Sequence, residues 1–176
     1  LMYWDKAESL YDIREEKVDI LEEALDENNS SLIIKKGFEI LCDDEIFNVK
    51  HFKPYTLNGS RYLLIEFSFH KTTEDDVISW CNYIKSFGIV PIIAHPERYN
   101  FVKNDVTCIN RLSDMGVLFQ VNAGSPAGAF GDYEMQVACA MINGGFVDFI
   151  GSDAHRLNIR NTDIGFFLER YPDVVD

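Results

Sequence analysis

The sequence predicts an α/β fold in which parallel strands alternate with helices. Five short apolar runs each lead to a polar residue, and three of the helical segments between them end in glycine. The polar residues are separated by 27, 29, 27 and 31 positions and are Glu39, Glu66, His95, Asn122 and Asp153. Because one strand–helix–strand unit takes about 30 residues, this spacing indicates a series of βα units.

The predicted strands are the apolar runs themselves. They span residues 32–34, 62–65, 90–94, 117–121 and 147–150. Continuous apolar runs are typical of strands buried on both faces of a parallel sheet. In a closed parallel barrel the catalytic groups lie at the carboxyl ends of the strands, and here those ends carry the five polar residues.

The predicted helices are marked by apolar residues at helical spacing. The first is expected to open at Asp12, where Glu15 completes a capping-box pattern, and to stop at residues 28–29. The next three cover residues 77–87, 109–115 and 135–142, and each precedes a glycine. A last helix is expected around residues 164–170. Residues 1–176 are therefore interpreted as one domain.

Charge and cysteine usage limit the classes of partner. Acidic residues number 29 against 16 Lys and Arg, and no basic cluster interrupts that surplus, which argues against nucleic-acid binding. The longest apolar run, residues 88–94, is too short to insert through a membrane. The four cysteines, at positions 42, 81, 108 and 139, occur singly, as is typical of reduced thiols in a cytoplasmic protein.

Two strand ends carry clusters of candidate metal ligands. One run continues from His95 through Pro96 into a charged pair, and another ends in Asp153-Ala154-His155. Residues two apart in an extended chain point the same way, so Asp153 and His155 are expected to face one site. Imidazole and carboxylate ligands suit manganese, iron or zinc. A role as turn former at the strand end or as helix cap suits Asn122 equally well, but the whole set would be costly to bring together without a cation.

Five ordered segments resemble the PHP superfamily of metal-dependent phosphoesterases. The resemblance is greatest to bacterial protein-tyrosine phosphatases that regulate capsule and exopolysaccharide synthesis. The segments are Gly37–Ile40, Leu64–Ser68, Ala94–Tyr99, Gln120–Asn122 and Gly151–His155. The stretch from His95 to Tyr99 discriminates best, since Asp-x-His and a strand-end Glu recur across the superfamily.

The resemblance implies a distorted TIM-like (β/α)7 PHP barrel with up to three divalent ions, with manganese expected and iron or zinc as alternatives. It implies hydrolysis of phosphotyrosine on an autophosphorylating tyrosine kinase. Glu39 would bridge two metals, and the other implied ligands are Glu66, His95, Asp153 and His155. Arg98 and Arg160 correspond to phosphate-binding arginines, whereas Glu97 and Tyr99 are expected to brace the loop.

The chain departs from this family pattern at its start. It has no opening strand with His-x-His and no second strand ending in histidine, and His51 and His70 are expected in loops or on the surface. We therefore expect an incomplete barrel that lacks about the first two βα units and also stops early. Exposed edges predict self-association, and phosphatase activity is expected to be far below that of a longer parent chain.

Three other interpretations stay open. A PHP-type small-molecule phosphatase acting on a substrate such as histidinol phosphate has the same fold. A degenerate barrel that docks a kinase without catalysis is also consistent with the missing ligands. In the third interpretation the acidic residues at the strand ends are purely structural, and the chain is simply an α/β domain. A cysteine-dependent phosphatase is not expected, because no cysteine is followed by arginine six positions later.

Overall fold

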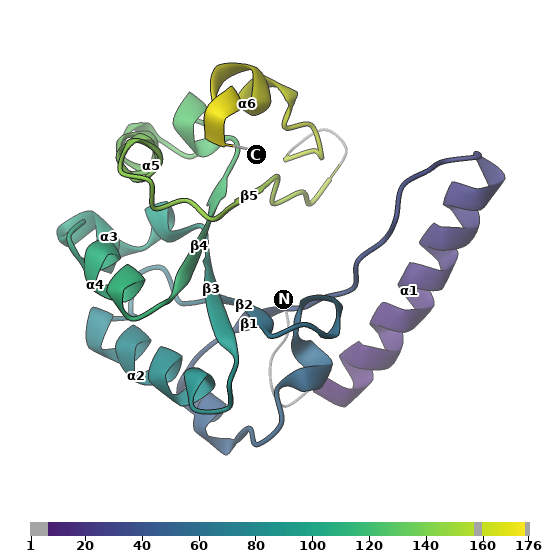
Figure 1. Ribbon diagram of the computed structural model, residues 1–176, viewed down its shortest axis with the longest axis horizontal. Coiled ribbons are helices and arrows are strands. Elements are labelled where there is room, and N and C mark those ends of the chain that lie inside the picture. Colours follow the sequence, from purple (N-terminus) through teal and green to yellow (C-terminus); the bar gives the residue numbers. More distant parts are fainter. Residues whose placement is uncertain (1–6, 157–159, 175–176) are drawn as a thin grey trace.

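A single parallel sheet carries the strands of this protein in the order of the sequence. The computed structural model describes residues 7–156 and 160–174. The sheet order is β1-β2-β3-β4-β5, and every neighbouring pair is parallel (Figure 1). The strands are β1 (Glu39–Leu41), β2 (Tyr62–Glu66), β3 (Val90–Ala94), β4 (Leu118–Asn122) and β5 (Phe149–Gly151). Their carboxyl ends therefore meet along one edge, as the sequence predicted.

Helices join the strands and cover the sheet on one side. The α-helices are α1 (Ala7–Glu27), α2 (Glu74–Lys85), α3 (Asn100–Asn104), α4 (Cys108–Asp114), α5 (Asp132–Asn143) and α6 (Gly165–Arg170). The 3-10 helices are η2 (Asp44–Asn48), η3 (Lys53–Tyr55), η4 (Leu57–Gly59), η5 (Pro96–Arg98), η6 (Ser125–Ala127) and η7 (Pro172–Val174). Helices α2 to α5 line one side of the sheet, whereas α1 stands apart as an arm (Figure 1).

The hydrophobic core lies between the sheet and these helices. Buried side chains of α2, α4 and α5, such as Cys81, Leu112 and Met141, pack with buried strand residues such as Ile65 and Val121. The prediction of strands buried on both faces is wrong for β1, β2 and β5. Buried and half-buried residues alternate in β1 and β2, because helices cover only one of their faces, and β5 has no buried residue. Strand β3 is buried almost throughout, as predicted.

The sheet is strongly curved. Tyr62 of β2 and Phe149 of β5 meet edge to face with ring centroids 6.4 Å apart. Three strand spacings in a flat sheet would separate β2 from β5 by about 14 Å. The two rings therefore lie on the concave face of a sheet that bends toward itself.

The predicted glycine ends of three helices are confirmed. Gly88, Gly116 and Gly145 have φ values of +73°, +76° and +72° after α2, α4 and α5, a conformation that glycine adopts without strain. All four cysteines are free; Cys139 is half-buried and the other three are buried. None of the helices in residues 7–156 and 160–174 combines the length and the apolar composition that a membrane span needs.

Two predicted boundaries are wrong. Residues 32–34 form no strand; Leu32 and Ile33 are 71% and 77% exposed, and the first strand begins only at Glu39. Backbone pairing with β2 decides this, because Glu39, Ile40 and Leu41 align with residues 64–66. The first helix is already formed at Ala7, so Asp12 is an interior residue and not its cap.

Candidate metal centre

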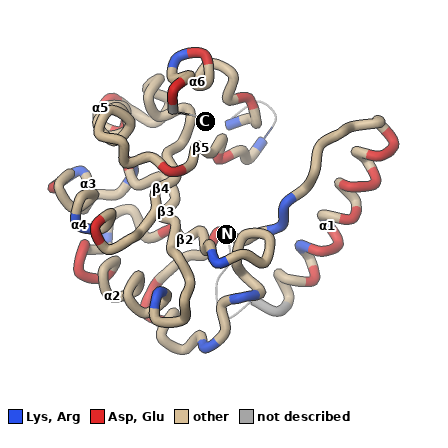
Figure 2. Tube along the Cα trace, viewed as in Figure 1, with Lys and Arg blue, Asp and Glu red and all other residues tan. Residues whose placement is uncertain are grey.

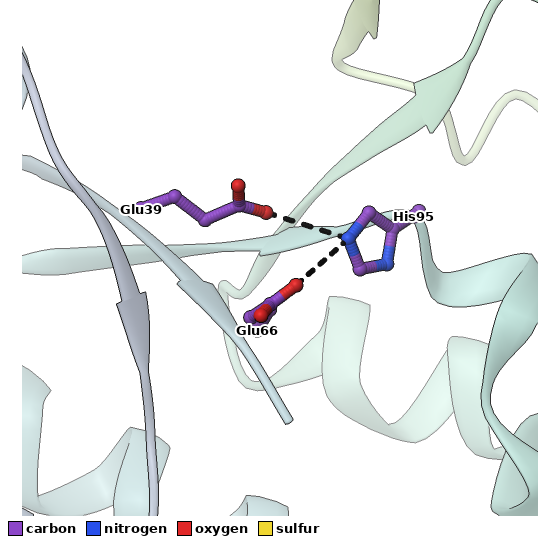
Figure 3. A group of neighbouring side chains, drawn as sticks. All are labelled: Glu39, Glu66 and His95. Carbon is purple, nitrogen blue, oxygen red and sulfur yellow. Dashed lines mark ion pairs between the residues drawn. The ribbon is translucent and has the colours of Figure 1, made fainter. Parts of the chain in front are cut away.

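Three potential metal ligands converge at the start of β1 and at the carboxyl ends of β2 and β3. His95 Nε2 lies 3.4 Å from Glu39 Oε1 and 3.2 Å from Glu66 Oε2 (Figure 3). All three ligand atoms lie within 4.8 Å of one another. Glu39 begins β1, Glu66 ends β2, and His95 follows β3, with its backbone N–H donating to the Gln120 carbonyl at 2.7 Å. The predicted cluster of Glu39, Glu66 and His95 is therefore present.

The spacing of these atoms fits a divalent ion. Two ligands that each lie about 2.1 Å from an ion, at a tetrahedral angle, are separated by roughly 3.4 Å. The distances from His95 to the two carboxylates match that separation. Hard oxygen ligands with one imidazole suit manganese, iron or zinc. The residues present therefore fit a metal, and an ion there would offset the repulsion between Glu39 and Glu66.

The electrostatics of this cluster favour positive charge. Burial by itself would lower the pKa of His95, but the Glu39 and Glu66 carboxylates outweigh burial and raise that pKa to about 9. Burial would raise the pKa of Glu39, but its interaction with His95 outweighs that effect and lowers it. The two carboxylates thus stabilise a cation between them, whether it is a proton on His95 or a metal ion.

Neighbouring residues hold His95 in place. Its backbone is in the left-handed region at φ +36°, which is uncommon for a residue other than glycine. The ring of Phe69 lies 5.5 Å from the His95 ring, and the ring of Tyr99 lies 5.6 Å from it. The buried Tyr99 hydroxyl accepts a hydrogen bond from the Phe67 N–H at 3.1 Å, which ties the loop after β3 to the end of β2. The expected bracing role of Tyr99 is confirmed.

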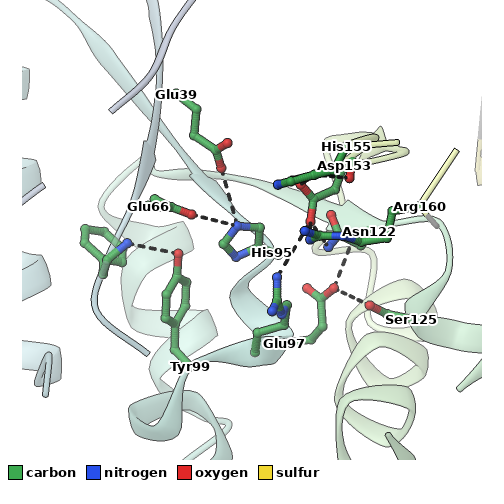
Figure 4. Close-up of polar contacts among 12 residues, drawn as sticks. Glu39, Glu66, His95, Glu97, Tyr99, Asn122, Ser125, Asp153, His155 and Arg160 are labelled. Carbon is green, nitrogen blue, oxygen red and sulfur yellow. Dashed lines mark hydrogen bonds and ion pairs between the residues drawn. The ribbon is translucent and has the colours of Figure 1, made fainter. Parts of the chain in front are cut away.

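Glu97 links the same loop to the end of β4. Its carboxylate accepts hydrogen bonds from the Asn122 N–H at 3.2 Å and from the Ser125 hydroxyl (Figure 4). The side chain is fully buried, and burial raises the pKa of its carboxyl group. Glu97 therefore braces the loop, as expected, and joins the His95 turn to η6.

A second cluster surrounds Asp153 after β5. Its Oδ2 accepts from Arg160 Nη1 at 2.6 Å and from Asn122 Nδ2 at 3.1 Å, and it lies 3.6 Å from Arg98 Nη1 (Figure 4). The structure therefore brings Arg98 and Arg160, the two predicted phosphate-binding residues, to one carboxylate. Asp153 and Arg160 both have positive φ, at +49° and +51°, which marks a constrained turn at this end of the sheet.

Asp153 and His155 are not brought into the group formed by the other three predicted ligands. The His155 side chain is 53% exposed, and its Nδ1 lies 2.8 Å from the Asp153 carbonyl oxygen. The remaining histidines are exposed and lie outside helices and strands, as predicted; His70 Nδ1 contacts the Asn100 amide at 3.1 Å.

Sequence patterns did not reveal several residues that shape the site. The guanidinium of Arg98 lies 4.5 Å from the ring centroid of Phe69 and 4.9 Å from that of Phe130. Ser125 binds Glu97 across 28 positions of the chain. These contacts join distant segments, so no periodicity along the sequence points to them. The only local signal is the Gly124-Ser125-Pro126 turn after a predicted strand end.

This chain is similar to one solved structure in fold and to several curated proteins in sequence. One crystal structure matches this chain with a TM-score of 0.78 and 27% sequence identity. The match covers 89% of this chain and 65% of the other chain. That structure comes from a study of YwqE from Bacillus subtilis and CpsB from Streptococcus pneumoniae, described as unique metal-dependent tyrosine phosphatases. The tyrosine-protein phosphatase CpsB of Streptococcus pneumoniae is 33% identical over 160 residues, which are 88% of this chain and 62% of that protein. The tyrosine-protein phosphatase YwqE of Bacillus subtilis is 32% identical over 107 residues, 60% of this chain and 41% of that protein.

The family model that matches this chain covers nearly all of it. This chain spans between about two fifths and two thirds of the length of the relatives described above. The family model for capsular polysaccharide synthesis proteins, CpsB/CapC, matches residues 3–169. With this extent of match, the protein belongs to the CpsB/CapC family of capsular polysaccharide synthesis.

Proposed function

We propose that this protein hydrolyses phosphotyrosine esters with the help of divalent metal ions. The observation that carries the proposal is the pairing of a metal-binding group, Glu39, Glu66 and His95, with two arginines gathered at Asp153. A metal-dependent phosphatase needs both a cation site and donors for the phosphoryl oxygens. The names of the matched relatives support the same activity.

The three clustered residues would hold a metal ion between the start of β1 and the carboxyl ends of β2 and β3. When bound, such an ion polarises phosphoryl oxygens and lowers the pKa of a coordinated water. Asp153 and His155 are proposed as further ligands. The Asp153 Oδ1 atom is the one on the side of His155, 3.4 Å from Nδ1, whereas Oδ2 accepts from Arg160 and Asn122. Manganese is the proposed metal, before iron or zinc.

Arg98 and Arg160 would bind the phosphate. Planar guanidinium groups make two parallel hydrogen bonds to phosphate oxygens, which fixes the orientation of the ester as well as its position. The net charge of −13 makes such local donors necessary. Figure 2 shows how densely acidic residues follow α1, so the protein as a whole does not attract anions.

The finer features of the proposal concern the whole protein. The substrate would be a cytoplasmic tyrosine kinase of capsule or exopolysaccharide synthesis, and residues 1–176 would form part of a PHP barrel. The strong curvature between β2 and β5 supports the barrel. Self-association is proposed through α1, where Ile13, Ile20 and Leu21 are each about half exposed.

The test is phosphate release from a phosphotyrosine peptide with added manganese. We expect release to stop with a chelator, to return with manganese, and to be lost in His95→Ala but kept in the matched control His51→Ala, whose histidine lies in an exposed loop. A strong preference for histidinol phosphate would favour the small-molecule phosphatase. Little bound metal, with kinase binding unchanged in His95→Ala, would favour the docking module.

A further inference from the structure

A small cavity adjoins the cluster around Asp153. It has a volume of about 170 Å³ and lies between the segment after β4, the end of β5 and the first turn of α6. Its apolar walls are two aromatic rings and two alanines, Phe130, Phe166, Ala123 and Ala129, and its polar walls are Ser152, Asn161, Arg160 and Asp163. The cavity therefore has a mixed lining, in which two rings and two alanines lie beside one cationic, one acidic and two neutral polar side chains.

Both arginines of the proposed phosphate site border this cavity or its wall. Arg160 lines it directly and donates to Asp153 at 2.6 Å. Arg98 packs against the Phe130 ring at 4.9 Å, and Phe130 is part of the wall. A phosphate bound by these arginines would lie at the border of the cavity.

The size and lining of the cavity suit one aromatic ring. Apolar protein cavities of about 150 Å³ bind benzene. In an aryl phosphate a single oxygen joins the ring to phosphorus, so the ring must lie within a few ångströms of the bound phosphate. Phe130 and Phe166 offer ring faces and edges for stacked or edge-to-face contact. Phe166 is 44% exposed, so its ring is accessible to an entering ligand.

We infer that this cavity receives the aromatic ring of an aryl phosphate, and that Phe130 and Phe166 make the site prefer aryl to alkyl phosphates. The inference rests on the proposed phosphate-binding role of Arg98 and Arg160. It adds a specificity pocket, formed by residues that approach one another only in the folded chain, to the metal centre and the arginines.

The first experiment measures selectivity with the 176-residue chain and manganese. The value of kcat/KM is compared for phenyl phosphate and ethyl phosphate in the wild type, Phe166→Ala and Phe166→Tyr. We expect Phe166→Ala to lower the phenyl-to-ethyl ratio about tenfold, while Phe166→Tyr, which keeps the ring, retains it. The matched control is Leu168→Ala, because Leu168 is exposed on the same helix and is not part of the cavity wall.

The second experiment does not depend on turnover. Binding of phenylphosphonate and methylphosphonate is measured by calorimetry in the same variants, whose folding is checked by thermal unfolding. If the wild type binds phenylphosphonate more tightly than methylphosphonate and Phe166→Ala loses this preference, the inference is supported. If no ester is hydrolysed in the same samples, the proposed function alone fails. Hydrolysis of phenyl phosphate with a phosphonate preference unchanged in Phe166→Ala overturns the inference alone. Absence of any phenylphosphonate binding also overturns it.

Discussion

The two ends of the sheet's carboxyl edge differ in charge. At β1 to β3, Glu39 and Glu66 face one imidazole, and in the described part of the chain neither carboxylate pairs with a lysine or arginine. At β4 and β5, one carboxylate, Asp153, is held by two arginines and an amide. The first end has a surplus of negative charge that a cation neutralises, whereas the second has a surplus of donors that suits an anion.

The difference arises from residues beyond the strands. Both ends present an acidic residue near a strand terminus, as βα repetition dictates. Arg98 lies in η5 and Arg160 lies in the loop before α6, and both reach toward the β5 end. The strands thus position the carboxylates, and the loops decide which of them lies beside arginines.

The largest effect is expected from removing the imidazole at the β1 to β3 end. His95→Ala should reduce metal affinity and phosphate release by at least about 100-fold, because it removes one of three converging ligands and leaves two carboxylates facing each other. Mass spectrometry measures the bound metal, and turnover of a phosphotyrosine peptide measures phosphate release. Asp153→Asn should lower metal affinity less, since the three clustered ligands stay; an equal loss would mean that both ends form one metal site.

A smaller effect is expected from changing an arginine at the β4 to β5 end. Arg160→Lys keeps the charge but loses the planar fork, so we expect kcat/KM for a phosphotyrosine peptide to fall about tenfold. Metal content should stay at the wild-type value, which calorimetric titration with manganese can check. Loss of metal in this variant would contradict the separation of the two ends.

The pH dependence of stability should come mainly from the β1 to β3 end. Without metal, protonated His95 stabilises the fold fully below its ordinary pKa of 6.5, and this contribution is lost as pH rises through about 9. We expect the free energy of unfolding in chelator to fall by about 1 to 3 kcal/mol across that range. Urea unfolding at several pH values measures it. Glu66→Gln should flatten the slope, and an unchanged slope would rule out this pair as its source.

The smallest effect is expected from the residue that joins the two ends. Burial already favours the neutral form of the Glu97 carboxyl group, and Glu97→Gln replaces it with a neutral side chain of the same shape. The amide oxygen of this variant can still accept hydrogen bonds from the Asn122 N–H and the Ser125 hydroxyl. We expect unfolding free energy to change by less than about 1 kcal/mol, whereas Glu97→Ala should cost about 2 kcal/mol. Thermal and urea unfolding compare the two variants. A large loss in Glu97→Gln would show that Glu97 must be ionised.

The sequence by itself determined the repeating βα units, the glycine ends of three helices and the meeting of Glu66 and His95. These features follow from local periodicity and from the rule that parallel strands share a carboxyl edge. Glu39 was predicted to end a strand, but it joins the other two residues from the start of β1. Tertiary structure alone decided that pairing starts at Glu39 rather than at the apolar residues 32–34, that β1 and β2 are covered on one face, and that Asp153 binds Arg98 and Arg160. It also brought Phe130 and Phe166 together around a cavity. Each of these depends on contacts between segments far apart in the chain, whose energies have no signature in the spacing of residues along it.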